Sequence, residues 1–197
     1  MHGVNLGGWL SQCNHTKERY DNFISFEDIE KIKGWGLDHI RVPVDYNLVE
    51  DEDGNYKEEG FAYIQKAIDW AGKCGLNMVL DLHKTYGFSF DSGEKEEGFF
   101  ENEAYQERFY KLWEEFARRY GSYRDRLCFE LLNEVTSTSR RSIPTSASCR
   151  RSIQKWSRLP TKTATTTSVW ASFSPRKTST KPSAGCATSA SSPTPEN

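Results

Sequence analysis

Apolar residues recur at helical spacing in three segments of the chain. The longest series is Phe109, Leu112, Trp113, Phe116 and Tyr120, at i, i+3, i+4, i+7 and i+11. Residues with this spacing share one face of an α-helix, so the series predicts an amphipathic helix that packs this face inward. The opposite side offers two oppositely charged pairs at i,i+4: Glu114 with Arg118, and Glu115 with Arg119.

Two shorter helices are predicted before this one. In the first, Ser25 offers an N-cap and Asp28 follows three residues later, an arrangement close to a capping box. The apolar positions are Ile29, Ile32 and Trp35 in the first helix and Phe61, Ile64, Ile68 and Ala71 in the second. Glycines after each series mark the ends of these helices.

Four short apolar runs, at residues 4–6, 39–42, 77–82 and 127–132, predict β-strands between the helices. Pro43 is expected to end the second strand. Strands and helices therefore alternate along the chain. Strands that are almost entirely apolar are typical of a parallel sheet that is buried on both faces.

This alternation predicts an α/β fold with two possible closures. One is an open, doubly wound sheet, and the other is a (β/α)8 TIM barrel, which takes about 250 residues and eight units. Only four strands fit before Val135, so we expect either a barrel truncated to about its first four βα units or a small open sheet. A half-barrel would expose two strand edges and an apolar inner face, so we expect poor folding and aggregation.

Composition changes abruptly near residue 135. Residues 1–135 contain 16 Lys and Arg against 27 Asp and Glu, a net charge of −11. Residues 136–197 contain 10 against 1, a net charge of +9, and are rich in Ser, Thr, Ala, Arg and Pro. We therefore divide the chain into a folded segment, 1–135, and a low-complexity tail, 136–197. Such a tail is typical of a disordered linker, but its abrupt start within a strand-end motif favours translation in a shifted reading frame.

Location and partners follow from features that the sequence lacks. No apolar run has the length of a membrane span, and the first residues leave no room for a signal peptide. The 5 cysteines are scattered and fit no metal-binding pattern, which favours free thiols in a reducing compartment. We expect a cytoplasmic protein with no membrane association, or a secreted one if the true N-terminus is missing. Motifs for nucleotide binding, zinc proteases and serine hydrolases are absent.

Polar and aromatic residues gather where the four predicted strands end. In parallel α/β folds the active site lies at the carboxyl ends of the strands. The residues there are Trp9, Arg41, His83, Asn133 and Glu134. An aromatic ring can stack on a sugar, an amide and an imidazole can bond its hydroxyls, and a carboxyl can protonate a leaving oxygen. This set suits sugar chemistry.

The same strand ends resemble motifs of glycoside hydrolase family 5, which contains cellulases and related β-glucanases. The segments that carry the resemblance are GVNLGGWL (3–10), HIRVPVDY (39–46), LDLHKTYG (80–87) and FELLNEV (129–135). The resemblance implies an eight-stranded barrel and retaining hydrolysis of a β-glucan or oligosaccharide. It also implies that no metal is needed. We expect no other cofactor and, if the protein is complete, a monomer.

The resemblance assigns roles to four residues. Glu134 matches the acid/base carboxyl, and Asn133 matches the residue that bonds the sugar 2-hydroxyl. Arg41 matches the arginine that orients the nucleophile, and His83 matches a histidine that contacts the substrate.

The second carboxyl of a retaining site is missing from this pattern. Retaining hydrolysis needs two carboxyls about 5–5.5 Å apart. Glu130 shares a predicted strand face with Glu134, but four residues of strand would separate them by roughly 13 Å. In the family the nucleophile lies on a much later strand, for which this chain has no matching sequence. We therefore expect the nucleophile to be absent and the chain as it stands to be inactive.

Other interpretations stay open for the same residues. Trp9 is equally consistent with packing inside the barrel. Arg41 could balance a structural carboxylate, either Asp45 or Asp81. His83 could be an ordinary histidine at a strand end.

Two further functions are considered for the whole chain. One is a carbohydrate-binding remnant that has lost catalysis. The other is nucleic-acid binding by the basic tail, which contains Trp156 and Trp170. No nucleic-acid-binding fold accompanies the tail, so we expect no nucleic-acid partner.

Overall fold

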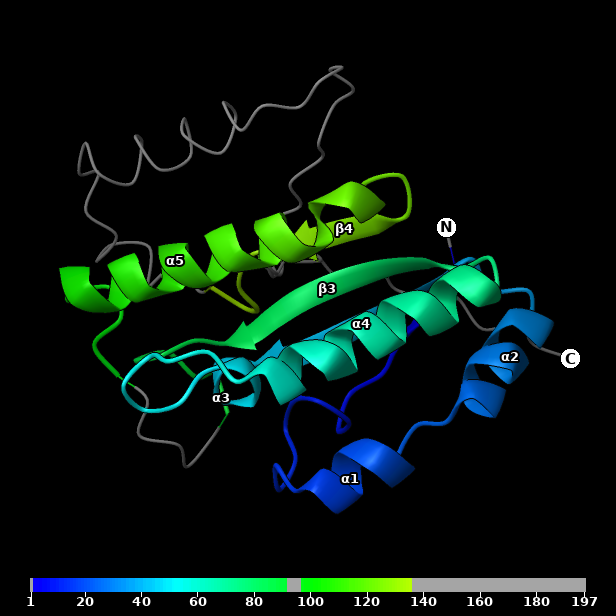
Figure 1. The fold of residues 1–197 in the computed structure, drawn as a ribbon, viewed down its shortest axis with the longest axis horizontal. Helices are drawn as coiled ribbons and strands as arrows, with labels where there is room; N and C mark the ends of the chain where they lie inside the picture. The colour runs from blue at the N-terminus through cyan, green and yellow to red at the C-terminus, as the bar shows by residue number, and fades with distance from the viewer. Residues whose placement is uncertain (1, 92–96, 136–197) are drawn as a thin grey trace, which may run out of the picture.

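The computed structural model describes residues 2–91 and 97–135 (Figure 1), so the tail at 136–197 and both interpretations of it lie outside the described residues. The strands are β1 (Gly3–Asn5), β2 (His39–Asp45), β3 (Asn77–Lys84) and β4 (Leu127–Glu130). The helices are α1 (Lys17–Asn22), α2 (Phe26–Gly34), α3 (Tyr46–Val49), α4 (Glu58–Lys73) and α5 (Glu103–Tyr120), followed by a 3-10 turn at Gly121–Tyr123.

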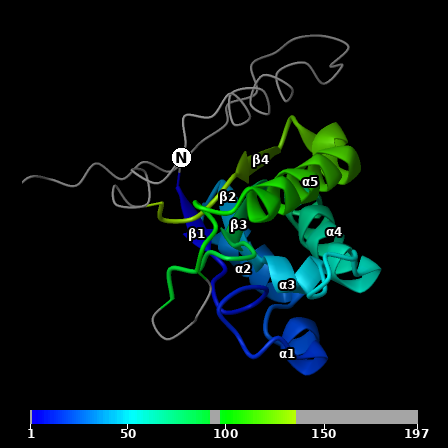
Figure 2. The same ribbon diagram turned by 90° about the vertical axis from the view of Figure 1, so that its left-hand side faces the viewer.

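All four strands form one parallel sheet in the order β1-β2-β3-β4. Figure 2 shows α2, α4 and α5 on the same side of this sheet. A doubly wound sheet carries helices on both faces and reverses its strand order, whereas a barrel adds strands in sequence and keeps its helices outside. The arrangement is therefore that of successive barrel units.

The two faces of the sheet differ in chemistry because side chains alternate along each strand. The helix-facing side is apolar and includes Ile40, Val42, Val44, Met78, Leu80 and Leu82, all at most 2 % exposed. The other side, which is the inner face of a barrel, carries Asn5, Arg41, Asp81, His83 and Glu130. The expected apolar inner face is wrong, because the apolar runs hide a polar residue at alternate positions.

β2 continues past Pro43, so the expectation that this proline ends the strand is also wrong. Alternate residues of a strand direct their N–H groups to the same neighbour. The Asp45 N–H donates to the Leu10 carbonyl oxygen at 3.2 Å, on the β1 side of the sheet. Position 43 faces that side too, where β1 has already ended at Asn5. Proline therefore gives up no strand-to-strand hydrogen bond there.

The helices match their predicted faces except at Trp35, which lies just after the end of α2 and is 70 % exposed, so its expected place on the buried face is wrong. The buried residues of α5 are Phe109, Leu112, Trp113, Phe116 and Tyr120, the full predicted series. Ser25 and Asp28 form the predicted capping box of α2. The packing of these helices on the sheet produces one hydrophobic core.

The structure bears on two of the remaining expectations, those about membrane spans and cysteines. No helix in the described part of the chain is long and apolar enough to span a membrane. The three cysteines that the structure describes, Cys13, Cys74 and Cys128, are free thiols, as expected.

Candidate active site

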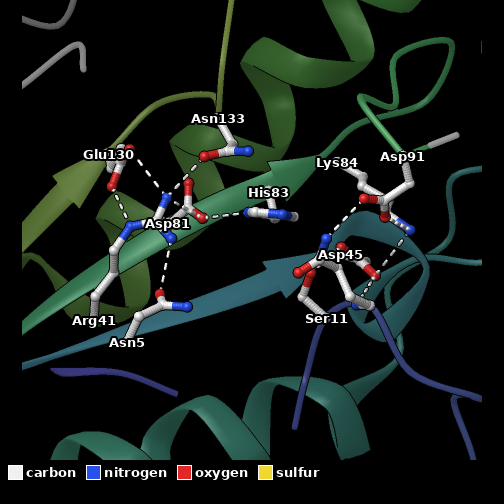
Figure 3. Close-up of polar contacts among 11 residues, drawn as sticks. Asn5, Ser11, Arg41, Asp45, Asp81, His83, Lys84, Asp91, Glu130 and Asn133 are labelled. Atoms are coloured by element: carbon white, nitrogen blue, oxygen red, sulfur yellow. Dashed lines mark hydrogen bonds and ion pairs between the residues drawn. The ribbon is translucent and has the colours of Figure 1, made fainter. Parts of the chain in front are cut away.

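Arg41 is the centre of a polar cluster on the inner face of the sheet (Figure 3). Its Nε and Nη2 donate to the two carboxylate oxygens of Glu130 at 2.7 and 3.1 Å. Nη1 donates to Asn5 Oδ1 at 2.9 Å, and Nη2 donates to Asn133 Oδ1 at 3.0 Å. Nη2 also lies 2.8 Å from Asp81 Oδ2. One guanidinium thus connects residues of all four strands and of the segment that follows β4.

Asn133 and Glu134 lie after β4, which ends at Glu130. The expectation that Glu130 and Glu134 share a strand face is therefore wrong. The Asn133 backbone N–H donates to the Leu82 carbonyl oxygen at 3.3 Å, which holds the segment beside the end of β3. Glu134 is exposed and has a φ of 50°, in the left-handed region that is unfavourable for a residue with a side chain. Such strain is typical of functional sites.

His83 follows Asp81 by two residues on the inner face of β3, and its Nδ1 lies 2.9 Å from Asp81 Oδ2. The side chain of His83 is 11 % exposed and that of Asp81 is 0 % exposed. Burial raises the pKa of the Asp81 carboxyl, and the neighbouring His83 and Arg41 offset only part of this effect. Burial alone would lower the pKa of Arg41, but Glu130 and Asp81 outweigh it and the pKa is raised. Arg41 is therefore a fixed positive charge.

A second polar cluster surrounds Asp45 at the end of β2 (Figure 3). Ser11 Oγ donates to Asp45 Oδ1 at 2.6 Å. Lys84 Nζ lies 3.7 Å from Asp45 Oδ2 and 2.7 Å from Asp91 Oδ2. Burial alone would raise the pKa of Asp45, but hydrogen bonds from His15 and Ser11, together with the Lys84 charge, lower it. The cluster ties the loop after β1 to the loop after β3, so it supports the rim on which the first cluster lies.

Trp9 is the one predicted site residue that the structure places away from this rim. It is 0 % exposed, its ring stacks on Trp70 with centroids 6.0 Å apart, and its Nε1 donates to the Tyr20 carbonyl oxygen at 2.9 Å. A ring enclosed in this way has no face to offer a sugar. Its assignment to substrate binding is corrected to packing, the other interpretation of the sequence.

The remaining four predicted residues lie close together. Arg41 contacts Asn133 directly, Glu134 follows Asn133 in the chain, and His83 is joined to Arg41 through Asp81. The other interpretation of Arg41, that it balances a structural carboxylate, also holds. Of the two carboxylates considered, Asp81 and Asp45, Arg41 pairs with Asp81.

Asp81 and Glu130 are members of the cluster that sequence reasoning did not assign to the site. Their signal was a period of two, since Asp81 lies two residues before His83 on one strand face. In the register Asp81 pairs with Glu130 on the next strand. A charged residue at alternate positions of an otherwise apolar strand therefore indicated the inner face.

The sequence also matches a model of a known family, described as Cellulase (glycosyl hydrolase family 5), over residues 6–171. The chain belongs to glycosyl hydrolase family 5. The match begins in the loop after β1 and extends beyond the described residues, so it includes every residue of both polar clusters except Asn5.

Curated relatives include a cellodextrinase and an endoglucanase. The chain is 58 % identical to Cellodextrinase A of Ruminococcus flavefaciens over 134 residues, which is 68 % of this chain and 40 % of that protein. It is 44 % identical to Endoglucanase C of Acetivibrio thermocellus over 136 residues, 68 % of this chain and 39 % of the relative. The chain therefore spans about 40 % of the length of these relatives.

Solved structures of glycoside hydrolases show the same fold. A family 5 xyloglucanase from Paenibacillus pabuli superposes with a TM-score of 0.57 at 27 % identity, over 68 % of this chain and 39 % of that one. A crystal structure of a glycoside hydrolase gives a TM-score of 0.63 at 21 % identity, over 78 % and 48 % of the two chains. The described residues thus have the arrangement of four successive strands of a (β/α)8 barrel with the helices between them.

Proposed function

We propose that this chain is part of an enzyme that hydrolyses the glycosidic bonds of β-glucans with retention, and that Glu134 is its acid/base. One observation carries the proposal: Asn133 is fixed by Arg41 at the carboxyl end of the sheet and directly precedes the exposed Glu134. The names of the family 5 relatives, a cellodextrinase and an endoglucanase, support a β-glucan as the substrate.

In the proposed reaction Glu134 acts twice. As an acid it gives its proton to the leaving glycosidic oxygen while a second carboxylate attacks the anomeric carbon and forms a glycosyl-enzyme bond. As a base it then takes a proton from the water that breaks this bond. Asn133 would bond the sugar 2-hydroxyl and His83 another hydroxyl, so the cluster around Arg41 would hold the ring in place.

We further propose that the nucleophile is not among the residues of this chain and that the chain alone is inactive. The inner-face carboxylates Asp81 and Glu130 are both ion-paired with Arg41 and buried, which makes them poor candidates for attack. Arg41 in turn presents its charge at the site, where it would orient the second carboxylate once that group is supplied.

A chimera tests this function. Residues 2–135 would replace the matching segment of the Ruminococcus flavefaciens cellodextrinase, so that the rest of that protein completes the barrel. We expect the chimera to release aryl alcohol from an aryl β-cellobioside. Glu134→Gln should lower kcat at least about 100-fold, because acid–base catalysis commonly contributes that much. Glu101→Gln, which changes another exposed glutamate, is the matched control and should leave the rate unchanged.

Two outcomes would contradict the proposal. A chimera whose rate survives Glu134→Gln would remove Glu134 as the acid/base. Hydrolysis by the 197-residue chain alone, abolished by Glu134→Gln, would show that the nucleophile is present after all.

The carbohydrate-binding alternative is tested by titrating the chain with cellobiose and with laminaribiose in a calorimeter. Saturable binding without hydrolysis would favour it, and flat isotherms would end it.

A further inference from the structure

The imidazole of His83 is held from one side by a fully buried carboxyl of the inner face. Asp81 is 0 % exposed, and its Oδ2 lies 2.9 Å from His83 Nδ1. A carboxylate can only accept hydrogen bonds, so Nδ1 must carry the hydrogen if Asp81 is ionised. In a neutral imidazole the other nitrogen, Nε2, is then an acceptor.

Arg41 and His83 stabilise the ionised form of Asp81, against the burial that raises the pKa of its carboxyl. Arg41 Nη2 lies 2.8 Å from the same Oδ2 oxygen. Glu130 on β4 is an acidic neighbour of Asp81, and Asp91 after β3 is an acidic neighbour of His83, whereas Arg41 is the cation in contact with Asp81. The other oxygen, Oδ1, is buried and has no hydrogen-bond partner among the described residues. Oδ2 is therefore the atom through which Asp81 acts on both of its neighbours.

We propose that Asp81 is a positioning residue that fixes His83 in the tautomer with hydrogen on Nδ1 and leaves Nε2 as the acceptor for a sugar hydroxyl. A hydroxyl that meets His83 must then donate its hydrogen, which limits the orientation in which a sugar can bind. This last step rests on the proposed function, in which His83 contacts the substrate. The tautomer itself does not depend on it.

Nitrogen-15 NMR of the histidine rings in the full chain tests the assignment at neutral pH. The two ring nitrogens have different chemical shifts according to which one carries hydrogen. The chain has 4 histidines, so the His83 signals can be identified as those lost in His83→Gln. We expect hydrogen on Nδ1 in the unsubstituted protein. A Leu side chain has no hydrogen-bonding group, so Asp81→Leu removes the acceptor of the Nδ1 hydrogen and should move the hydrogen of His83 to Nε2.

Asp45→Leu is the matched control. Asp45 is also 0 % exposed on the inner face and also contacts one histidine, with its Oδ2 3.2 Å from His15 Nε2. This substitution should change the His15 signals and leave those of His83 in place, which separates a specific effect from a general loss of structure.

Either of two results would overturn the assignment. Hydrogen on Nε2 of His83 in the unsubstituted protein would do so, and this spectrum is informative even if Asp81→Leu does not fold. An unchanged His83 tautomer in a folded Asp81→Leu protein would do so as well. Neither spectrum requires sugar or turnover, so a failure of the proposed hydrolysis would leave this result readable on its own.

Discussion

Arg41 brings a positive charge to a place where its side chain is only 23 % exposed and two carboxylates contact it. Removing one partner of a buried ion pair lowers the free energy of unfolding by more than the intact pair contributes to it. The reason is that the remaining charge stays buried without compensation. Here the loss of one cation would leave Asp81 and Glu130 facing each other. The inner face is therefore expected to be most sensitive at this residue.

Arg41→Met should lower the free energy of unfolding by about 3–5 kcal/mol. Urea unfolding followed by tryptophan fluorescence would measure it. Adding Glu130→Gln should recover part of the loss, since one of the two stranded charges is then removed. Arg118→Met is the control, because Arg118 is 67 % exposed in its ion pair and the change should stay within about 0.5 kcal/mol. Equal losses for both arginines would contradict this account.

At the same scale, the sequence predicted Arg41, His83, Asn133 and Glu134 because each lies near or just after the end of an apolar run that is easy to recognise. It left Trp9 open between two roles, since an indole next to a glycine pair fits both a core and a sugar platform. Burial decides such cases, and burial depends on partners distant in sequence, such as Trp70.

Among the elements, α3 and α4 approach each other closely at Gly60, in the first turn of α4. A Cβ at this position would lie 2.0 Å from the Leu48 carbonyl oxygen of α3. Gly60→Ala must therefore push the two helices apart, and it should cost about 2–3 kcal/mol of stability. Gly34→Ala at the end of α2 is the control, because its Cβ would meet nothing within 4 Å. That change should stabilise by about 0.5–1 kcal/mol. Urea midpoints of both variants check the contrast, and a neutral Gly60→Ala would refute the close approach.

Helix α5 is joined to α4 by a network of charges that depends on pH. Arg118, and then Arg119, hold the pKa of Glu115 at about 2. A carboxyl whose pKa is lowered by folding contributes stability above its unfolded pKa and loses it as the pH falls through the folded value. Glu115→Gln should therefore reduce stability by about 1 kcal/mol at pH 7 and by progressively less between about pH 4.5 and pH 2. Thermal melts across this range would show it, and a difference that is constant with pH would contradict it.

Among the helices, the sequence predicted the longer ones and overlooked the two short ones, α1 and α3, for a physical reason. A periodic apolar stripe needs several turns, which α5 has, with 18 residues. The helices α1 and α3 have 6 and 4 residues and present no stripe. Their positions are set by contacts, such as the hydrogen bond from Tyr63 Oη on α4 to Asp21 Oδ1 on α1 at 2.8 Å. Pro43 was misjudged for a similar reason, because the cost of a proline depends on whether a neighbouring strand still runs beside it.

For the whole molecule, the sequence predicted the parallel α/β class but left its closure open. The order of the strands and the single layer of helices identify a barrel. Both are properties of the assembled sheet, so the sequence pattern alone does not contain them. In the described part of the chain β1 and β4 each pair with one strand only, so they form its two edges. Because the inner face is polar, these edges are now the feature that favours association.

The charge division of the chain offers a competing route to association, and salt separates the two. Residues 1–135 carry a net charge of −11 and residues 136–197 one of +9, so copies could also attract each other through these opposite charges. Such attraction weakens as the Debye length falls from about 10 Å at 0.1 M salt to about 3 Å at 1 M, whereas backbone pairing between edges does not. We expect sedimentation velocity to show association that grows with protein concentration, persists at 1 M salt and remains after deletion of residues 136–197. The chimera, whose barrel is complete, should sediment as a monomer under the same conditions. Association that vanishes in salt or with the tail would assign it to charge, and a monomeric 197-residue chain would show that the edges of the sheet are covered.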